Sequence, residues 1–277
     1  MPRFSLRLII VTATAAAAGT LPAGAASFSM ASHRAIYDLT LDDASVGGDI
    51  ADVSGRMVME FTGSACAGYT TKLRFVTESE DSDGQSQVID SRSDIFETAD
   101  GNSMRFVNET FTDDALSEES RGSASRKGKD IAVALTKPST KSFDLPTAIV
   151  FPTEQMQALI TGAEAGQRFV SLDLYDGSED GETVFTTAGV IGPEADDKDD
   201  TGDEGTIKAA GLGGLRHWPV TISYFNDKKG GDETPYYVMS FIVYENGIGR
   251  SLRINYGNFA LSGRLTQLDL LPAQPCP

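Results

Sequence analysis

The chain is poor in the residues on which many enzymes build their active sites. Its 277 residues include two histidines, His33 and His217, two cysteines and one tryptophan. The motifs H-E-x-x-H, G-x-S-x-G, S-x-x-K and G-x-x-x-x-G-K-[ST] are all missing, which removes the signatures of zincins, α/β-hydrolases, serine β-lactamases and P-loop nucleotidases. We therefore predict no catalytic residue, no cofactor and structural roles for both histidines.

Positive charge is also scarce. The chain has 23 basic and 40 acidic residues, so its formal net charge is −17. A surface of this sign repels nucleic-acid phosphates and anionic lipid head groups. We exclude nucleic acid as a partner and attribute the acidity to solubility.

The sequence has no hydrophobic run long enough for a membrane-spanning helix. Its N-terminal apolar run, Leu8 to Ala18, is 11 residues long, whereas a span needs roughly 20. Arg3 and Arg7 precede this run and Ala23-Gly24-Ala25 follows it, which is typical of a secretory signal peptide. No cysteine follows the cleavage site to accept a lipid anchor. We expect a signal peptide over residues 1–25 and a single periplasmic domain over residues 26–277, not embedded in a membrane.

The two cysteines, Cys66 and Cys276, form an even pair in a chain predicted to be exported. Such a pair in an oxidising compartment is typical of a structural disulfide. A redox site would place the cysteines close together, as in C-x-x-C. We predict a disulfide between Cys66 and Cys276.

The dominant pattern is alternation of apolar and polar residues in short segments bounded by Gly, Asp, Asn and Ser, which predicts antiparallel strands. Eight segments are clear: 37–41, 53–61, 69–75, 131–135, 170–174, 218–224, 237–243 and 261–265. Four are weaker: 86–96, 104–111, 182–190 and 252–256. The fold class is therefore mainly β, an antiparallel curved sheet or open barrel of about a dozen strands. An outer-membrane barrel is disfavoured because charges such as Asp90, Arg92 and Asp94 crowd the strands.

One segment has helical periodicity instead. Met156, Leu159, Ile160 and Ala163 fall at helical spacing, with Thr153 as the expected N-cap and an end near Gly166. We predict one short helix that covers one side of the sheet. The acidic stretches 173–182 and 196–204 are predicted as solvated loops, and calcium binding by either stays open because the full calcium-loop pattern fails.

Several local runs together suggest a family. They are Ser32 to Leu39, Leu145-Pro146, Phe151 to Met156, Tyr175 to Glu179 and His217 to Val220. With the two cysteines, they make the chain resemble the cell-envelope integrity protein B (EipB) family of Gram-negative bacteria. The resemblance implies a periplasmic, spiral-like open barrel of antiparallel strands, with a disulfide between an early segment and the C-terminus. It also implies a role in maintaining the cell envelope under stress, with no established active site to transfer.

Three functional hypotheses follow. The first is a non-enzymatic envelope protein that binds a periplasmic protein or envelope component. The second is a carrier of an apolar, lipid-like ligand in a cavity lined by residues such as Met57, Met59, Phe61, Phe75 or Trp218. The third is an unrecognised hydrolase of envelope glycans or peptides. An open apolar cavity would favour the carrier, and two buried carboxylates facing each other across a polar cleft would favour the hydrolase.

Overall fold

The computed structural model describes residues 30–44, 49–195, 203–226 and 234–276. The predicted signal peptide and most of the second acidic stretch lie outside these residues. The elements are β1 (His33–Ala44), β2 (Ile50–Ser64), β3 (Gly68–Asp81), β4 (Ser86–Glu97), β5 (Ser103–Thr112), β6 (Ala115–Lys127), β7 (Asp130–Lys137), β8 (Lys141–Pro146), α1 (Pro152–Glu164), β9 (Phe169–Leu174), β10 (Phe185–Ile191), α2 (Glu204–Ala209), β11 (His217–Asn226), β12 (Tyr237–Tyr244), β13 (Gly249–Asn255) and β14 (Phe259–Leu270).

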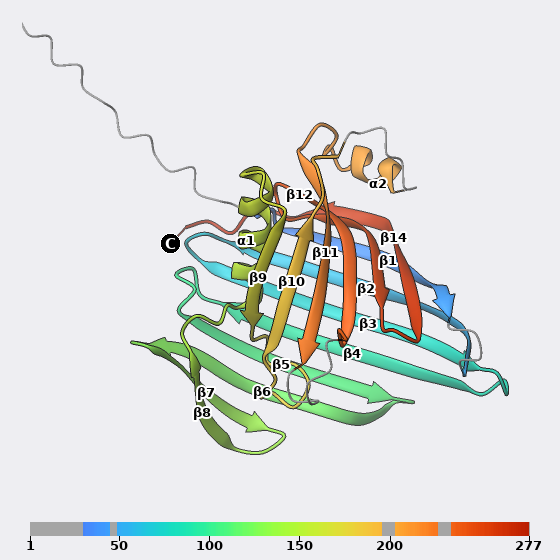
Figure 1. The fold of residues 1–277 in the computed structure, drawn as a ribbon, viewed down its shortest axis with the longest axis horizontal. Coiled ribbons are helices and arrows are strands. Elements are labelled where there is room, and N and C mark those ends of the chain that lie inside the picture. Colours follow the sequence, from blue (N-terminus) through green and yellow to red (C-terminus); the bar gives the residue numbers. More distant parts are fainter. Residues whose placement is uncertain (1–29, 45–48, 196–202, 227–233, 277) are drawn as a thin grey trace, which may run out of the picture.

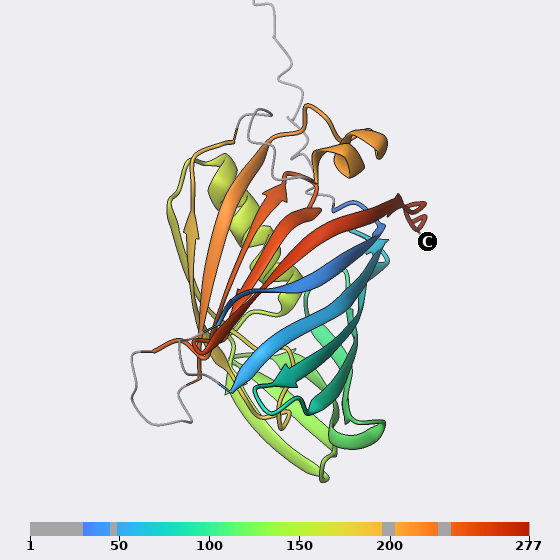
Figure 2. The ribbon, with the colours of Figure 1, turned by 90° about the vertical axis from the view of Figure 1, so that its right-hand side faces the viewer.

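All described strands belong to one sheet of 14 strands in the order β8-β7-β6-β5-β4-β3-β2-β1-β14-β13-β12-β11-β10-β9. Every neighbouring pair is antiparallel. The sheet does not close, because β8 and β9 end it without pairing with each other. It curls so that β9 to β12 cross over β2 to β5, and β1 and β14 form the bend (Figures 1 and 2). The predicted open, antiparallel β architecture is confirmed.

The first core cluster fills the space between β1, α1 and the strands β9 to β14. Its most buried members include Ala35, Ile160, Val243 and Ile248. A second cluster lies under β4 to β7 and includes Met104, Phe106, Ile131 and Phe151. The described residues therefore contain two larger apolar clusters and a third, smaller one formed by Met30, Phe61 and Tyr69.

Helix α1 differs from the prediction at its start. Its N-cap is Phe151, and Pro152 occupies the first helical position, where the missing N–H and fixed φ of proline fit best. Thr153 therefore lies inside the first turn, so its assignment as N-cap was wrong. Leu159, Ile160 and Ala163 are buried, and α1 packs against β9 and β10.

The prediction of a single helix was also wrong, because the described residues contain the second helix α2. It has six residues, which is too short for a 3.6-residue period to be recognised. Two strands were missed as well. The inward residues of β6 are small or charged, such as Glu118 and Ser120, and β8 has six residues ending in proline.

Candidate functional site

Neither histidine is placed for catalysis. The Nδ1 atom of His33 lies 2.7 Å from the carbonyl oxygen of Ala31, and that of His217 lies 2.9 Å from the carbonyl of Leu215. Nδ1–H therefore donates in both rings. Both rings are buried, and neither Nε2 atom has a hydrogen-bond partner among the described residues. Burial lowers the pKa of His33, which favours the neutral imidazole.

The concave face changes from apolar to polar along two adjacent cross-strand rows. In the first row, Tyr37, Met57, Phe75, Ser91, Thr110 and Glu118 follow one another from β1 to β6. In the second row, the order is Ala35, Met59, Leu73, Ser93, Asn108 and Ser120. We call the six residues from β1 to β3 the apolar wall and the six from β4 to β6 the polar wall. The change falls between β3 and β4 in both rows.

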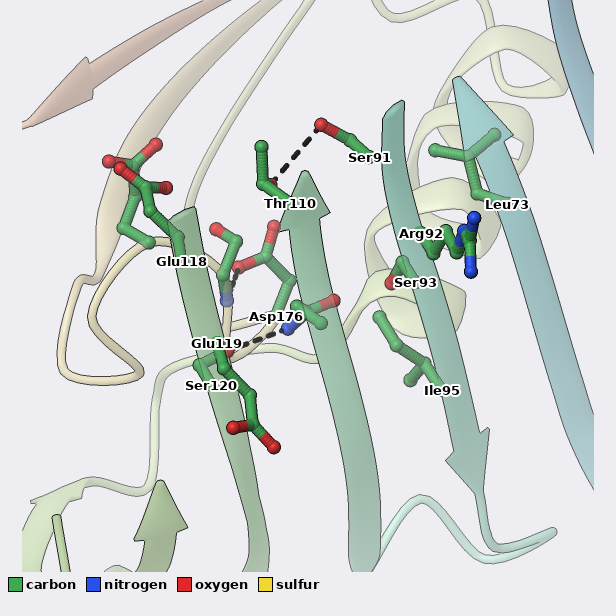
Figure 3. Close-up of a pocket in the computed structure, with 13 residues that line it drawn as sticks. Leu73, Ser91, Arg92, Ser93, Ile95, Thr110, Glu118, Glu119, Ser120 and Asp176 are labelled. Carbon is green, nitrogen blue, oxygen red and sulfur yellow. Dashed lines mark hydrogen bonds between the residues drawn. The ribbon is translucent and has the colours of Figure 1, made fainter. Parts of the chain in front are cut away.

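A pocket of about 260 Å³ lies on the polar wall (Figure 3). It is lined by Leu73, Ser91, Arg92, Ser93, Ile95, Asn108, Thr110, Glu118, Glu119, Ser120, Asp176, Ser178 and Glu179. Figure 3 shows the hydroxyls of Ser91 and Thr110 joined by a hydrogen bond, 3.2 Å long, across β4 and β5. We call this the polar pocket. The strands supply hydroxyl and amide groups, and the segment between β9 and β10 supplies Asp176 and Glu179.

The segment that carries Asp176 is fixed to the polar wall by its backbone. Asn108 Nδ2 and Ser120 Oγ both donate to the carbonyl oxygen of Gly177, at 2.9 and 2.5 Å. Gly177 has φ of 72°, and an added Cβ would lie 2.4 Å from the ring of Phe106. Only glycine fits this close approach at positive φ. The contact therefore joins the late part of the chain to β5 and β6.

The four carboxylates of the polar pocket differ in environment. Burial raises the pKa of Asp176, although its Oδ1 accepts a 2.9 Å hydrogen bond from the Ser178 N–H. Glu118 and Glu179 are exposed. Glu119 pairs with Arg121 at 3.4 Å and Lys137 at 3.1 Å. Asp176 is partly buried and none of the four is fully buried, so the pocket lacks the two facing buried carboxylates expected of the hydrolase.

Tyrosine rings lie close enough to Asp176 to interact with its charge. Tyr224 and Tyr237 stack with ring centroids 4.3 Å apart. Burial raises the pKa of both hydroxyls, and the charge of Asp176 raises it further. Tyr237 also contacts the ring of Tyr256, at 6.3 Å. The acidic side of the interior is therefore bordered by neutral aromatic groups.

A second pocket, of about 110 Å³, lies on the apolar wall. Its lining residues are Tyr37, Met57, Met59, Met156, Met239, Phe241, Gly247, Gly249, Arg250 and Leu252. We call it the methionine pocket. Met57 and Met59 line it as predicted. The other three predicted residues are core residues instead: Phe61 packs with Met30 and Tyr69, Trp218 is buried, and Phe75 packs against the first cluster.

Arg250 closes one side of the methionine pocket and is fully buried. Its Nε donates to the Tyr244 hydroxyl at 3.0 Å, and its guanidinium lies 5.9 Å from the centroid of the Tyr244 ring. Sequence reasoning missed this residue because an arginine in a strand is usually exposed. The flanking Gly249 and Ser251 offered no signal of burial.

A buried carboxylate lies at the start of α1. Glu97 of β4 accepts hydrogen bonds from the backbone N–H of Thr153, at 2.9 Å, and from its hydroxyl, at 2.7 Å. Burial raises the pKa of Glu97 to about 7 in spite of these bonds. Its other oxygen has no partner among the described residues. Glu97 thus joins β4 to the helix and titrates near neutral pH.

Cys66, in the turn between β2 and β3, forms a disulfide with Cys276 in the C-terminal tail, and the two Cα atoms are 5.4 Å apart. Within the described part of the chain, no group of three or more His, Cys, Asp or Glu side chains could hold a metal ion. Nor does any helix there have the length and apolar character needed to cross a membrane.

Comparisons with known proteins agree with this architecture. The chain matches the EipB-like family model over residues 24–272. It is 44% identical over 252 residues to the curated cell envelope integrity protein EipB of Brucella abortus (strain 2308), covering 90% of this chain and 88% of the relative. It also matches the crystal structure of a β-barrel-like protein from Brucella abortus with a domain of unknown function. There the TM-score is 0.80 and the identity 42%, over 89% of this chain and all of that one. The predicted resemblance is confirmed, and the chain belongs to the EipB-like family.

Proposed function

We propose that this protein maintains the integrity of the cell envelope by binding a protein or another envelope component on its concave face, without catalysis. The observation that carries the proposal is the polar pocket, which lies on the inside of an open sheet. The 44% identical relative is named a cell envelope integrity protein, which supports the envelope role.

The compartment is part of the same proposal. We place the mature protein in the periplasm as a single domain over residues 26–277, after removal of the signal peptide. The basic residues, short apolar core and small residues at the N-terminus support this placement. The disulfide between Cys66 and Cys276 also supports an oxidising compartment.

The chemistry of the polar pocket supports binding rather than hydrolysis. A glycan hydrolase uses an acid and a second carboxylate that flank the scissile bond. Here Asp176 is desolvated, whereas Glu118 and Glu179 face solvent and Glu119 is engaged with Arg121 and Lys137. Most of the other lining residues carry hydroxyl or amide groups, and these suit the orientation of a ligand.

A second candidate function is the transport of an apolar ligand. The methionine pocket favours it, because four methionines line one small cavity and unbranched, polarisable side chains adapt to apolar guests of different shapes. An engineered apolar cavity of about 150 Å³ in another protein stays dry and binds benzene. A cavity of about 110 Å³ therefore has room for part of an aliphatic chain.

Two measurements test the proposed function. Deleting the gene in its own organism should sensitise cells to detergents that attack the envelope, and a plasmid copy should restore resistance. Native mass spectrometry of the protein from its own periplasm should then show a retained partner protein or small ligand. Normal detergent resistance in the deletion strain would overturn the envelope role, and a bare protein with glycan-cleaving activity would overturn the binding role.

A further inference from the structure

The two cross-strand rows place an apolar and an acidic region side by side on one concave face. We propose that this face binds an amphiphile with an aliphatic chain and a primary ammonium head group. The chain lies on the apolar wall and in the methionine pocket, and the head lies in the polar pocket. The inference rests on the proposed binding function and names the chemistry of the envelope component.

The charge of the polar pocket selects the head group. Three of its lining carboxylates, Glu118, Asp176 and Glu179, belong to the concave side. Glu119 and Arg92 also border the pocket, but strand register places both side chains in the convex row, where Glu119 pairs with Lys137 and Arg92 donates to Asp90 at 2.6 Å. An anionic head would face the three concave carboxylates, whereas an ammonium would be attracted to them. The pocket therefore favours a cation.

The lining also matches the hydrogen bonds of an ammonium group. An ammonium has three donors and no acceptor, and the hydroxyl oxygens of Ser91, Ser93 and Thr110 can accept. Asp176 adds a carboxylate that is partly buried. Ionic hydrogen bonds are stronger where water is excluded, so Asp176 is the expected main partner of the head.

The two pockets are close enough for one molecule to occupy both. Leu73 lines the polar pocket and is the direct cross-strand partner of Met59, which lines the methionine pocket. Neighbouring strands lie roughly 4.8 Å apart, so the distance from β2 to β5 is about 14 Å. A decyl chain with its head group spans such a distance. The combined space of the two pockets also falls in the range of about 300–1,000 Å³ typical of ligand sites.

Titration calorimetry with three probes of equal chain length tests the head group. Decylammonium, decanol and decanoate are titrated into the mature, disulfide-bonded protein below their micelle concentrations. Decylammonium should bind at least tenfold more tightly than either of the others. Equal affinity for all three would show nonspecific apolar binding. A preference for decanoate would show that the head group binds Arg250 of the methionine pocket instead of the polar pocket. Either result overturns the proposal.

Matched variants test the site. Asp176→Asn should weaken decylammonium binding at least tenfold, whereas Asp94→Asn should leave it unchanged. Asp94 is an exposed carboxylate of β4 that pairs with Lys72 at 2.7 Å on the convex face, so it controls for the loss of one charge. Met59→Ser should weaken decylammonium binding but leave the weaker binding of butylammonium unchanged. Equal losses in Asp176→Asn and Asp94→Asn would overturn the assignment, because they would reflect net charge alone.

The same variants separate this inference from the proposed function. Melting temperatures first show that each variant is folded. If Asp176→Asn and Met59→Ser fail to bind decylammonium and also fail to restore detergent resistance, both the ligand and its role stand. If wild-type protein restores resistance but binds none of the probes, the amphiphile is overturned while the envelope role remains.

Discussion

The two sides of the concave face differ in what fills them. Against the strands β9 to β14, the interior is packed with apolar groups such as Trp218, Val243 and Ile254, which are nearly inaccessible to water. Against β4 to β6, the inward groups are mostly small and polar, and a pocket remains. Packing of the first kind supplies stability, because each buried aliphatic side chain contributes about 1.5–3 kcal/mol. The small polar groups on β4 to β6 contribute less to stability and leave a pocket with room for a ligand.

The convex face of the early strands is charged. Strands β1 to β7 carry ion pairs between exposed side chains, including Arg56 with Asp38 at 2.9 Å and Lys72 with Asp94 at 2.7 Å. Exposed pairs of this kind contribute roughly 0–1 kcal/mol each. They maintain solubility on strands whose inner face is partly open. The early half of the sheet is therefore held chiefly by its backbone ladder, by the second core cluster and by contacts from the late half.

The largest loss of stability is expected from the disulfide. Cys66→Ser should lower the free energy of unfolding by up to about 5 kcal/mol, because the bond closes a loop with a sequence separation of 210 residues. Cys276→Ser and the double variant should show the same loss. Denaturant unfolding measures it, and hydrogen exchange should show greater loss of protection in β14, β1 and β2 than in β6 to β8. An unchanged melting temperature would contradict this expectation.

A pair of truncations compares the two sides directly. Ile160→Ala removes a fully buried side chain of the first core cluster and should cost about 2–5 kcal/mol. Ser93→Ala on the polar wall should cost less than about 1 kcal/mol, because its hydroxyl lines a pocket. Chemical denaturation of both variants at one pH gives the difference. Similar losses in the two variants would remove the distinction between packed and open sides.

The third prediction concerns pH. The pKa of Glu97 is about 7 in the folded protein and about 4.3 in an unfolded chain. The stabilising contribution of its protonated form is therefore fully present below about pH 4.3 and is lost as the pH rises through about 7. Glu97→Gln should be more stable than wild type at pH 8, by up to about 3 kcal/mol, with little difference at pH 4.

Unfolding free energies of the two proteins at pH 4, 6 and 8 check this expectation. Asp100→Asn in the neighbouring turn serves as the control, because side-chain and backbone hydrogen bonds from Thr98 and Asn102 lower the pKa of Asp100 to about 2. Its effect should not grow between pH 6 and pH 8. A Glu97→Gln variant that is equally destabilised at all three pH values would show that Thr153 depends on the carboxylate form.

The smallest effect is expected at the contact between the two halves. Gly177→Ala would place a Cβ 2.4 Å from the Phe106 ring at φ of 72°. Gly84→Ala has φ of 79° with no atom within 4 Å of its added Cβ. Because both substitutions share the backbone strain, the difference between them isolates the steric clash, about 1–3 kcal/mol. Equal melting temperatures would show that the segment moves away freely.

The late strands could be predicted from sequence because they bury one face and expose the other, as in Trp218, Val220, Ile222 and Tyr224 of β11. Strand β6 could not, because its inward Glu118 and Ser120 line a pocket and its outward residues are polar too. The polar wall was missed for the same reason. The residues of β4, β5 and β6 form the polar wall only because the register of these strands aligns them. Register in a 14-stranded sheet is a long-range property that alternation within one strand does not determine.

The order of the strands and the position of the disulfide leave the two edges of the sheet apart from its connected middle. In a closed barrel, strand number and stagger fix the diameter. Here β2, β1 and β14 lie in the middle of the strand order, and the disulfide joins the turn beside β2 to the tail beyond β14. The outer strands β8 and β9 form the two edges of the sheet. The hydrogen bonds to Gly177 connect the segment after β9 to β5 and β6. Small changes of twist at each strand junction would therefore change the distance between β8 and β9 without breaking the ladder, and we expect the bound ligand to shift that distance.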